Sequence, residues 1–444
     1  MKIKKPQREV SIQESMATVF DLSQEKFDIL RSFADEKYKP YEDFRLALAG
    51  DFTKADSEIL WPFVRFLRER NNTESPVKSP TGQFFTYNKL KYFDKLLHEI
   101  DMQFGRQDII TKAALHGNLS EKELILNSII EEAVASSQIE GASTTREKAK
   151  EMLKTGRKPR DQSEQMIGNN FEVIKSIEDE LGYKPLSKSL LFEMHKKLMS
   201  KTRNDWDDIV ERFRRDEENI VVQNSFTGVI YHTPPLSVFV EKEIDRLIEF
   251  ANSKENVPFV HPLIKAIILH FWIGYLHPFV DGNGRLARAL FYWSMLNSGY
   301  TVFGYLPISR VIKVAKLQYS MAYVNTEQDN NDLSYFLDFN LKKVSQAIDE
   351  FRIYVNKKQE AQKILAEEES KFGLNSRQMA GLIYLKKESG KTLNINIYKS
   401  LTQSSLPTAI KDLKELETKK IVTSKKVGRE RIYRLISKPH QSGS

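Results

Sequence analysis

The fold of this chain is decided by residues 277–288, which read His277-Pro278-Phe279-Val280-Asp281-Gly282-Asn283-Gly284-Arg285-Leu286-Ala287-Arg288. The stretch lies between two strongly apolar runs. Residues 263–276 are apolar apart from Lys265 and His270, a pattern that predicts a buried helix. Pro278 has no N–H group and disfavours the helical conformation of the residue before it, so this helix should end at His277.

The second half of the stretch predicts an anion site. Gly282 and Gly284 allow tight turns and leave backbone amides uncovered, and a second helical pattern begins near Arg285. A glycine-rich turn that opens a helix binds anions, because free N–H groups and the positive end of the helix dipole face the ligand. Arg285 and Arg288 are three residues apart and share one helix face. Two guanidinium groups there suit a polyphosphate.

The same stretch carries a base and a carboxylate. Asp281 is a hard oxygen ligand that could hold Mg²⁺ against the phosphates. His277 has the side chain best suited to accept a proton near neutral pH. Each feature alone has an ordinary explanation: a packed histidine, a simple turn, or a solvated arginine pair. Their occurrence together within residues 277–288 indicates phosphate chemistry next to a nucleophile.

These residues resemble the motif of Fic domains, H-P-F-x-[D/E]-G-N-G-R-x-x-R, at every defined position. The resemblance implies a mainly α fold with a Fic-type helical core. It also implies transfer of AMP from ATP to a protein hydroxyl, with release of pyrophosphate. In this family the motif histidine takes the proton of the target hydroxyl, which corresponds to His277. Asp281 would hold Mg²⁺, and Phe279 would seat the loop.

The resemblance also assigns the nucleotide contacts. Gly282, Asn283 and Gly284 would form the anion hole, and Arg285 and Arg288 would contact the β- and γ-phosphates. Some Fic relatives instead transfer phosphate or phosphocholine, or remove AMP, and the motif leaves these reactions open. The expected ATP-binding residues are Gly282, Asn283, Gly284, Arg285, Leu286, Ala287 and Arg288.

A second segment, residues 136–141, reads Ser-Ser-Gln-Ile-Glu-Gly and follows a helical pattern over residues 124–134. It resembles the inhibitory helix motif of Fic proteins, [S/T]-x-x-x-E-[G/N], with Ser136, Glu140 and Gly141 at the defined positions. The implied helix lies near residues 128–141. Its glutamate would pair with Arg288 and misalign ATP, since Arg–carboxylate pairs are geometrically specific. The alternative is an ordinary helix end capped by Gly141.

A third segment predicts a β-hairpin, because β-branched runs at residues 219–222 and 228–235 surround a polar turn. In Fic proteins such a flap covers the active site and aligns the target segment by strand addition. Family members often have glycine two residues before the Phe213-Arg214 pair, where this chain has Glu211. A plain structural hairpin is the alternative. The expected docking residues are Val229, Ile230, Tyr231 and His232.

Composition sets outer bounds on the protein. Its 444 residues favour two or three domains, and a hydrophobic fraction of 40% is enough for proper cores. The absence of cysteine excludes disulfides and thiolate metal sites, which fits a cytoplasmic location. Residues 1–14 are polar and do not form a secretory signal. The apolar run at residues 263–276 is too short to span a bilayer, so no membrane association is expected.

Positive charge is concentrated near the C-terminus. The whole chain has a net charge of +8, whereas residues 371–438 hold 16 Lys and Arg against 5 Asp and Glu, a net charge of +11. Local charge of this kind indicates binding to nucleic acid or another polyanion. A solvated lysine-rich surface is the alternative.

The same region has its own pattern of elements. Helices are predicted at residues 377–386, 394–401 and 409–417, followed by strands at residues 421–423 and 432–435. This order resembles a winged helix-turn-helix, which Fic proteins often carry C-terminally. Such domains bind DNA through phosphate contacts, dock proteins or form a homodimer, and the sequence leaves these partners open. The expected phosphate contacts are Lys411, Lys414, Lys425, Lys426 and Arg429.

Four regions follow along the chain: a mixed helical region (1–110), a Fic domain (111–355), a linker (356–374) and a winged helix-turn-helix (375–438). Two functions remain. The chain is either an autoinhibited enzyme that adenylylates Ser, Thr or Tyr of a protein target, itself included, or a DNA-binding regulator with the Fic body as a sensor or relic.

Overall fold

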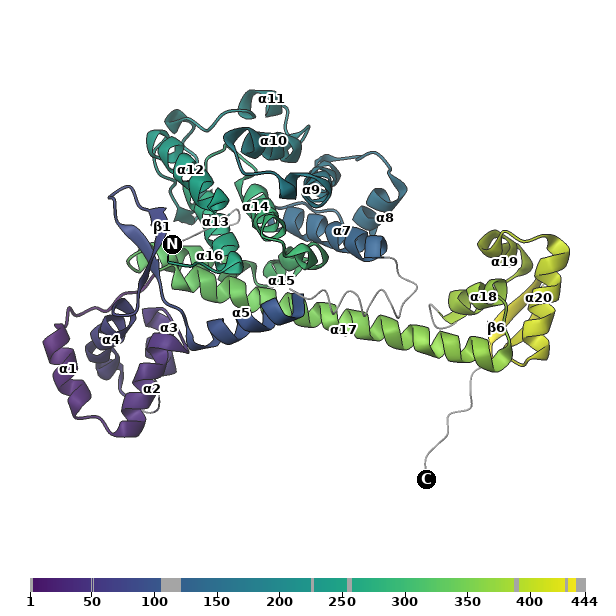
Figure 1. Ribbon diagram of the computed structural model, residues 1–444, viewed down its shortest axis with the longest axis horizontal. Helices are drawn as coiled ribbons and strands as arrows, with labels where there is room; N and C mark the ends of the chain where they lie inside the picture. Colours follow the sequence, from purple (N-terminus) through teal and green to yellow (C-terminus); the bar gives the residue numbers. More distant parts are fainter. Residues whose placement is uncertain are drawn as a thin grey trace. The chain divides into compact units, whose positions relative to one another are not determined.

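The computed structural model describes residues 3–48, 50, 52–104, 121–224, 227–253, 258–386, 391–427 and 430–436. These residues fold mainly into helices, with small two-stranded antiparallel sheets (Figure 1). The mainly α fold expected from the sequence is therefore confirmed. Two compact units divide the chain, one up to Ile353 and the other from Tyr354 onward. Each is described by itself.

The first unit begins with a small helical layer. Its elements are α1 (Ile12–Phe20), α2 (Gln24–Asp35), α3 (Tyr41–Ala47) and α4 (Lys54–Glu69). Amphipathic helices of this kind bury their apolar stripe against one another. Trp61 and Val64 of α4 are buried with Phe33 and Phe44 in one cluster.

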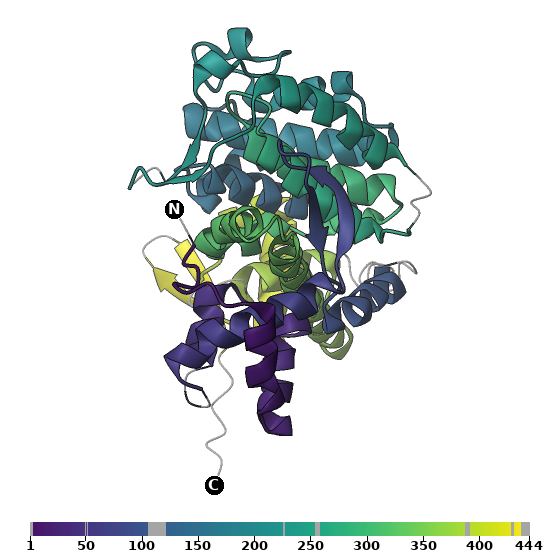
Figure 2. The same cartoon turned by 90° about the vertical axis from the view of Figure 1, so that its left-hand side faces the viewer.

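A hairpin of β1 (Thr73–Lys78) and β2 (Phe84–Tyr87) leads to α5 (Lys91–Phe104). The hairpin packs against helices α12 and α13 of the central body, as the two views show (Figures 1 and 2). Thr86 extends this contact, since its N–H donates to Asn331 O (3.1 Å) and its C=O accepts from the Leu333 N–H (2.8 Å).

The central body is built from longer helices. Two of them, α13 (Pro262–Leu276) and α14 (Asn283–Asn297), lie side by side and are buried on nearly every face. A helix that is apolar all round belongs in a core. The surrounding elements are α7 (Glu121–Ile139), α8 (Arg146–Thr155), α9 (Gln162–Asp179), η1 (Leu181–Tyr183), α10 (Lys188–Met199), α11 (Trp206–Ile209), η2 (Asp216–Glu218), α12 (Ser237–Asn252), η3 (Thr301–Tyr305), α15 (Ile308–Val314) and α16 (Lys316–Gln328).

Several elements extend beyond the sequence patterns that predicted them. Helix α7 continues past the pattern at residues 124–134 to Ile139, so Ser136 lies inside it, within the helix expected near residues 128–141. Helix α17 (Ser334–Phe372) runs into the predicted linker at residues 356–374 as far as Phe372. The predicted flap hairpin is present as β3 (Val222–Gln223) and β4 (Ile230–His232).

The second unit has three helices followed by a hairpin, the element order that the sequence predicted. They are α18 (Ser376–Lys386), α19 (Ile395–Thr402), α20 (Leu406–Thr418), β5 (Val422–Val427) and β6 (Glu430–Leu435). Lys425 and Lys426 lie on β5, not in the turn where they were predicted, because the strand is longer than its apolar start. The prediction for Arg429 falls outside the described residues.

None of the helices in the described ranges combines the length and apolar character needed to cross a bilayer. Helix α13 is the most apolar of those around the site, and it has 15 residues.

Arg68 of α4 joins the N-terminal helices to α17. It is 4% exposed. Its Nη2 donates to Phe33 O (2.8 Å) and Lys39 O (2.9 Å), and its Nη1 donates to the Tyr335 hydroxyl (2.9 Å). The guanidinium also lies 3.8 Å from the centre of the Tyr38 ring. Three acceptors thus bond to one side chain, two of them buried and the third, Lys39 O, partly buried.

We expect Arg68→Ala to lower the free energy of unfolding by about 3 kcal/mol, because hydrogen bonds from a charged donor to buried acceptors are lost. Arg65→Ala is the matched control on the same helix. Its pair with Glu69 is largely exposed, so the change should cost about 0.5 kcal/mol or less. Urea unfolding of both variants measures the difference, and equal effects would contradict a structural role for Arg68.

Candidate active site

His277 sits at the point where α13 stops. It is the C-cap residue of that helix, with φ 46° and ψ 57°, and its N–H donates to Ile273 O (3.0 Å). The left-handed conformation is uncommon for a residue other than glycine, but Pro278 excludes the helical one. The predicted helix end is therefore confirmed, and the side chain is turned out of the helix at a fixed position.

The side chain of Asn283 holds the loop after His277 in place. The side chain of Asn283 accepts from the Phe279 N–H (2.9 Å) and donates to Phe279 O (2.8 Å). Phe279 is fully buried and stacks on the His195 ring, with ring centres 3.7 Å apart. The Asn283 side chain thus holds the loop. Only the backbone of Asn283 is left to contribute to an anion site at the start of α14. Phe279 lies where a residue that seats the loop would lie.

Arg214 fixes the loop from the other side. Its Nε donates to His277 O (2.8 Å), and its backbone N–H donates to Pro278 O (2.8 Å). The sequence marked the Phe213-Arg214 pair only as a neighbour of the flap. His195 was missed altogether, although its Nε2 bonds to Asp281 O (2.8 Å). A histidine on the apolar face of the helix predicted over residues 186–199 was the only signal for it.

The proton on His277 can be placed from its partner. Nδ1 faces Gly274 O at 3.2 Å, and a carbonyl oxygen only accepts, so Nδ1 carries the hydrogen and Nε2 keeps its lone pair. Burial, and next the proximity of His232, lowers the pKa of His277 to about 4. The ring is therefore neutral near pH 7, and Nε2 is free to accept a proton.

The start of α14 is an uncapped helix end. Gly282 has φ 84° and no side chain to cap the helix, so the N–H groups of the first helical residues have no partner within it. A Cβ at Gly282 would lie 2.8 Å from Met199 Sδ. The side chains of Leu286 and Ala287 are fully buried, so an anion could reach only their backbone.

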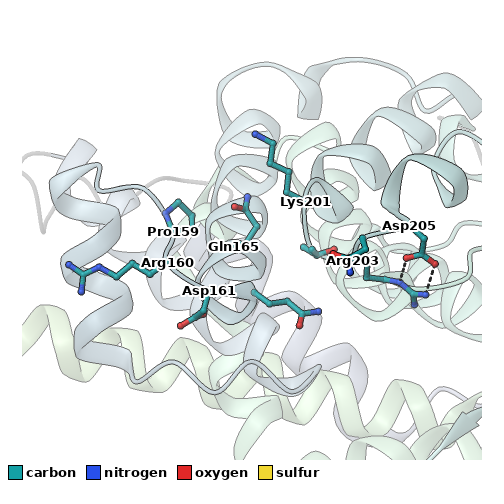
Figure 3. Close-up of a pocket in the computed structure, with 10 residues that line it drawn as sticks. Pro159, Arg160, Asp161, Gln165, Lys201, Arg203 and Asp205 are labelled. Atoms are coloured by element: carbon teal, nitrogen blue, oxygen red, sulfur yellow. Dashed lines mark hydrogen bonds and ion pairs between the residues drawn. The ribbon is translucent and has the colours of Figure 1, made fainter.

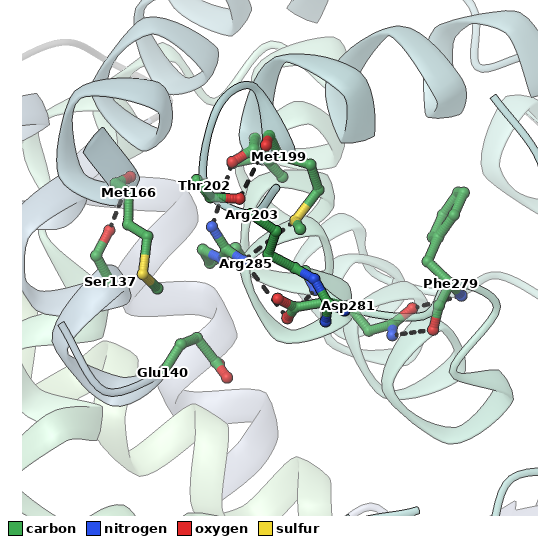
Figure 4. A network of polar contacts seen from close by, with 12 residues as sticks. Ser137, Glu140, Met166, Met199, Thr202, Arg203, Phe279, Asp281 and Arg285 are labelled. Carbon is green, nitrogen blue, oxygen red and sulfur yellow. Dashed lines mark hydrogen bonds and ion pairs between the residues drawn. The ribbon is translucent and has the colours of Figure 1, made fainter. Parts of the chain in front are cut away.

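Arg285 is 1% exposed and turned toward the end of α10 (Figure 4). Its Nη1 donates to Leu198 O (3.2 Å), and its Nη2 lies 3.5 Å from Asp281 Oδ1. Asp281 is partly exposed, and the same oxygen accepts from the Gly282 N–H (2.5 Å). No group of three or more metal-ligating side chains occurs among the described residues. A lone carboxylate still fits Mg²⁺ carried by a polyphosphate, which supplies most of the other ligands.

Arg288 is held by α7. Its Nε donates to Ser136 Oγ (2.8 Å), and its Nη2 donates to Ser136 O (3.0 Å) and to Glu140 Oε1 (2.8 Å). Burial disfavours both charges, yet the ion pair outweighs burial: the pKa of Glu140 is lowered and that of Arg288 is raised. Nη1 of the arginine has no partner in the described part of the chain. The three residues that the sequence linked thus meet.

Gly284 makes room for this pair. A Cβ at Gly284 would lie 2.2 Å from Glu140 Oε1 and 3.2 Å from Arg288 Nη1. Figure 4 shows Glu140 reaching from the end of α7 toward the region of Asp281 and Arg285. Gly141, the last residue of the expected motif, has φ 101°, a conformation that favours glycine.

One cavity joins these groups. Its volume is about 120 Å³, and it is lined by residues from α13, α14, α16, the flap and the end of α7. Among them are Glu140, Tyr231, His232, Gly274, His277, Gly284, Arg288, Tyr319 and Tyr323. A larger cavity of about 630 Å³ lies between residues 159–165 and 201–205 (Figure 3). It contains no residue of the 277–288 stretch, and its Arg203 is paired with Asp205. The smaller cavity is therefore the candidate site.

Two residues of the flap are exposed to solvent, and two line the cavity. Val229 and Ile230 are 40% and 46% exposed. Tyr231 and His232 line the cavity, and the His232 ring is buried. A docked segment could therefore contact the side chains of Val229 and Ile230, whereas the His232 side chain lies in the interior. Glu211, found where relatives often have glycine, has φ 61°, the backbone conformation that glycine adopts without strain.

Comparison with known proteins finds relatives of the part of the chain that contains this site. Residues 185–295 match the model of the Fic/DOC family. The protein adenylyltransferase Fic of Nematostella vectensis is 32% identical over 100 residues, which are 21% of this chain and 23% of that protein. The protein adenylyltransferase fic-1 of Caenorhabditis elegans is 30% identical over 100 residues, 20% of its length. The chain thus spans about a fifth of the length of these curated relatives.

One solved structure has a similar fold over most of the chain. The Fic family protein from Desulfovibrio desulfuricans G20 superimposes with a TM-score of 0.53 at 20% identity, covering 80% of this chain and 99% of that chain. At this identity the likeness concerns the fold alone.

We expect the imidazole of His277 to titrate near pH 4, well below an ordinary histidine. Its pKa is lower in the folded than in the unfolded chain, so protonation favours unfolding. The stability it contributes is complete above about pH 6.5 and is lost as the pH falls toward 4. Histidine NMR between pH 3.5 and 8 measures the titration, with His277→Gln for assignment. A midpoint near 6.5 would show that the ring is not desolvated.

Proposed function

Since the chain is a Fic-domain protein, we propose that it is an autoinhibited protein adenylyltransferase, which transfers AMP from ATP to a Ser, Thr or Tyr hydroxyl of a protein. One observation carries the proposal. The free Nε2 of His277, the uncapped start of α14 and Arg288 share a cavity, and Glu140 already occupies that arginine.

The geometry supports a phosphate site at the start of α14. The phosphates of ATP would accept hydrogen bonds from the amides of Asn283, Gly284 and Arg285, where the helix dipole adds positive potential. Arg285 and Arg288 would contact the β- and γ-phosphates. Asp281 would hold Mg²⁺, which neutralises charge on the departing pyrophosphate.

The chemical step then follows from His277. Its Nε2 accepts the proton of the target hydroxyl, and the hydroxyl oxygen attacks the α-phosphorus of ATP. The new oxygen–phosphorus bond forms as the bond from the α-phosphorus to the bridging oxygen breaks, and pyrophosphate leaves. The flap would align the target segment by strand addition, with Val229 and Ile230 offering apolar contacts.

Inhibition would arise from competition for Arg288. The carboxylate of Glu140 lies 2.8 Å from Nη2 of that arginine, where a γ-phosphate would otherwise be bound. A carboxylate beside the phosphate site also repels the incoming polyanion. Other reactions of the family remain alternatives, since removal of AMP or transfer of another phosphate-linked group would use the same base and anion site.

A second candidate function concerns the C-terminal unit, which we propose binds DNA. The solvent face of α20 carries Lys411 and Lys414, and β5 carries Lys425 and Lys426, all of them exposed. Buried Asp412, paired with Arg377 (2.8 Å), fixes the orientation of α20 within the unit. Lysines on a helix and an adjacent hairpin suit phosphate contacts. A homodimer or a protein partner is the competing use of this face.

We expect Glu140→Gly to raise transfer of label from α-labelled ATP to protein by about ten- to a hundredfold, because Arg288 loses a charged hydrogen-bond partner. Adding His277→Ala should lower the transfer by about 10²–10⁴-fold. Glu131→Ala is the matched control, since Glu131 lies on the same helix but pairs with Arg146 and Lys150.

Incubation of each purified protein with labelled ATP and Mg²⁺, followed by mass spectrometry of the modified peptides, reads out the reaction. Equal or weaker labelling of Glu140→Gly would refute inhibition. No AMP adduct on the chain or on added cell protein in any variant would refute adenylyl transfer.

We expect the full chain to bind random duplex DNA with a strong dependence on salt. Lys411→Ala and Lys414→Ala should each reduce the slope of log affinity against log salt by about 1. Lys148→Ala on α8 is the control. Fluorescence anisotropy measures the affinities, and slopes unchanged by the α20 substitutions would assign this face to protein docking.

A further inference from the structure

His232 of the flap has an oxygen atom at each ring nitrogen. Its Nδ1 lies 2.6 Å from Glu327 Oε2, and its Nε2 lies 2.7 Å from Tyr275 O. The side chain is 7% exposed. Water therefore has little access to either contact, and the ring depends on these two partners.

The two contacts together require an extra proton. Tyr275 O is a carbonyl oxygen and only accepts, so Nε2 must carry hydrogen. A neutral imidazole has one N–H, and Nδ1 would then point a lone pair at a carboxylate oxygen 2.6 Å away. That approach is favourable only with a proton between the two atoms. The His232–Glu327 pair therefore holds one proton more than a neutral ring and a free carboxylate.

Among the described residues, no second group compensates the negative charge of the Glu327 carboxylate. Its second oxygen, Oε1, is buried and lacks a hydrogen-bond partner there. A buried carboxylate without a cation is costly. The carboxylate therefore depends on the shared proton as much as the ring does.

The pair ties together three elements that line the cavity. His232 belongs to β4, Tyr275 lies two residues before His277 in the last turn of α13, and Glu327 lies in the last turn of α16. The final carbonyls of a helix have no partner within it, and a cation near a helix C-terminus is stabilised by the dipole. One ring thus connects the flap to the helix that delivers the base.

We propose that His232 is a positioning residue, which holds the flap against the end of α13 through its contacts with Glu327 and with Tyr275 O. The proposal rests on the proposed function, because it concerns how the flap aligns a target hydroxyl with His277. If the proton between Nδ1 and Glu327 were absent, the two atoms would repel one another and this contact would be lost.

Neighbouring charges act on this pair from several elements. Glu327 touches the ring, and Glu243 of α12 acts on Tyr275 from the other side. Cationic Arg214 lies near His277 and opposes additional positive charge there. The ionisable groups near the pair are Tyr323 on α16, Tyr275 and His277 at the end of α13, Glu243 on α12, Arg214 before the flap and Glu140 at the end of α7.

Hydrogen–deuterium exchange of the peptide covering residues 228–235 at pH 7 tests the proposal without requiring activity. We expect the β4 amides of Glu327→Ala to lose about tenfold of their protection relative to the parent protein, because Nδ1 of His232 loses its partner. In Glu327→Gln, the amide N–H₂ can donate to Nδ1 of a neutral ring whose Nε2–H still donates to Tyr275 O. Both contacts then form, so protection should match that of the parent.

Two further variants complete the design. His232→Leu should lower protection at least as much as Glu327→Ala, and thermal unfolding of the same protein checks that the body remains folded. His261→Gln is the matched control: His261 also pairs with a carboxylate, Asp101 (3.1 Å), but at the opposite end of α13. It should retain the protection of the parent. Protection equal to that of the parent in Glu327→Ala or in His232→Leu would overturn the proposal.

Labelling in the Glu140→Gly background adds a functional readout. Glu327→Gln should leave the rate of self-modification in that background unchanged, whereas His232→Leu should reduce the rate by about tenfold at pH 7 and leave the affinity for ATP unchanged. If no variant transfers label, the proposed function fails, while the exchange data still decide the role of His232.

Discussion

The candidate site depends on the abrupt turn between two buried helices. Because α13 ends at Leu276 and α14 begins at Asn283, a base and an uncapped helix start are separated only by a short loop. Both helices belong to the densely packed core, where a shift of either would create voids or clashes. Hydrogen bonds from the side chains of Asn283 and Arg214 hold the loop itself. The packing of the two helices therefore sets the distance between the base and the anion site, and motion of the loop changes it little.

Arg288 shows how the proposed inhibition could be reversed without disordering the site. Two of its three bonds go to Ser136, one to the hydroxyl and one to the backbone, and both of these acceptors are uncharged. Loss of the Glu140 contact would leave the guanidinium in the same orientation, with Nη1 and one hydrogen of Nη2 available to a ligand. In this proposal the serine orients the arginine, and the glutamate, just beyond the end of α7, blocks it.

Local chemistry made much of this site predictable. Pro278, Gly282 and the apolar run before His277 predicted the helix end, the turn and the helix start from neighbouring residues alone. The pairing of Glu140 with Arg288, 148 residues apart, came from resemblance to a family, since no spacing implies it. The bonds of Arg214 and His195 to the loop also join distant segments, and a histidine on an apolar helix face was only a weak sequence signal for the second of them. The role of the Asn283 side chain was not predicted either, because its partner is the backbone of Phe279, which any sequence would offer.

The charges around His277 suggest how nucleotide binding would change the base. Burial is the main reason that its pKa lies near 4, His232 lowers it further, and Glu140 raises it. A base with so low a pKa is a weak proton acceptor at pH 7, since general base catalysis is most efficient when the pKa lies near the working pH. A bound polyphosphate would place several negative charges where Glu140 now supplies one, and nearby anions favour the protonated imidazole. In the proposed function, the ligand that displaces Glu140 from Arg288 would thus also strengthen His277 as a base.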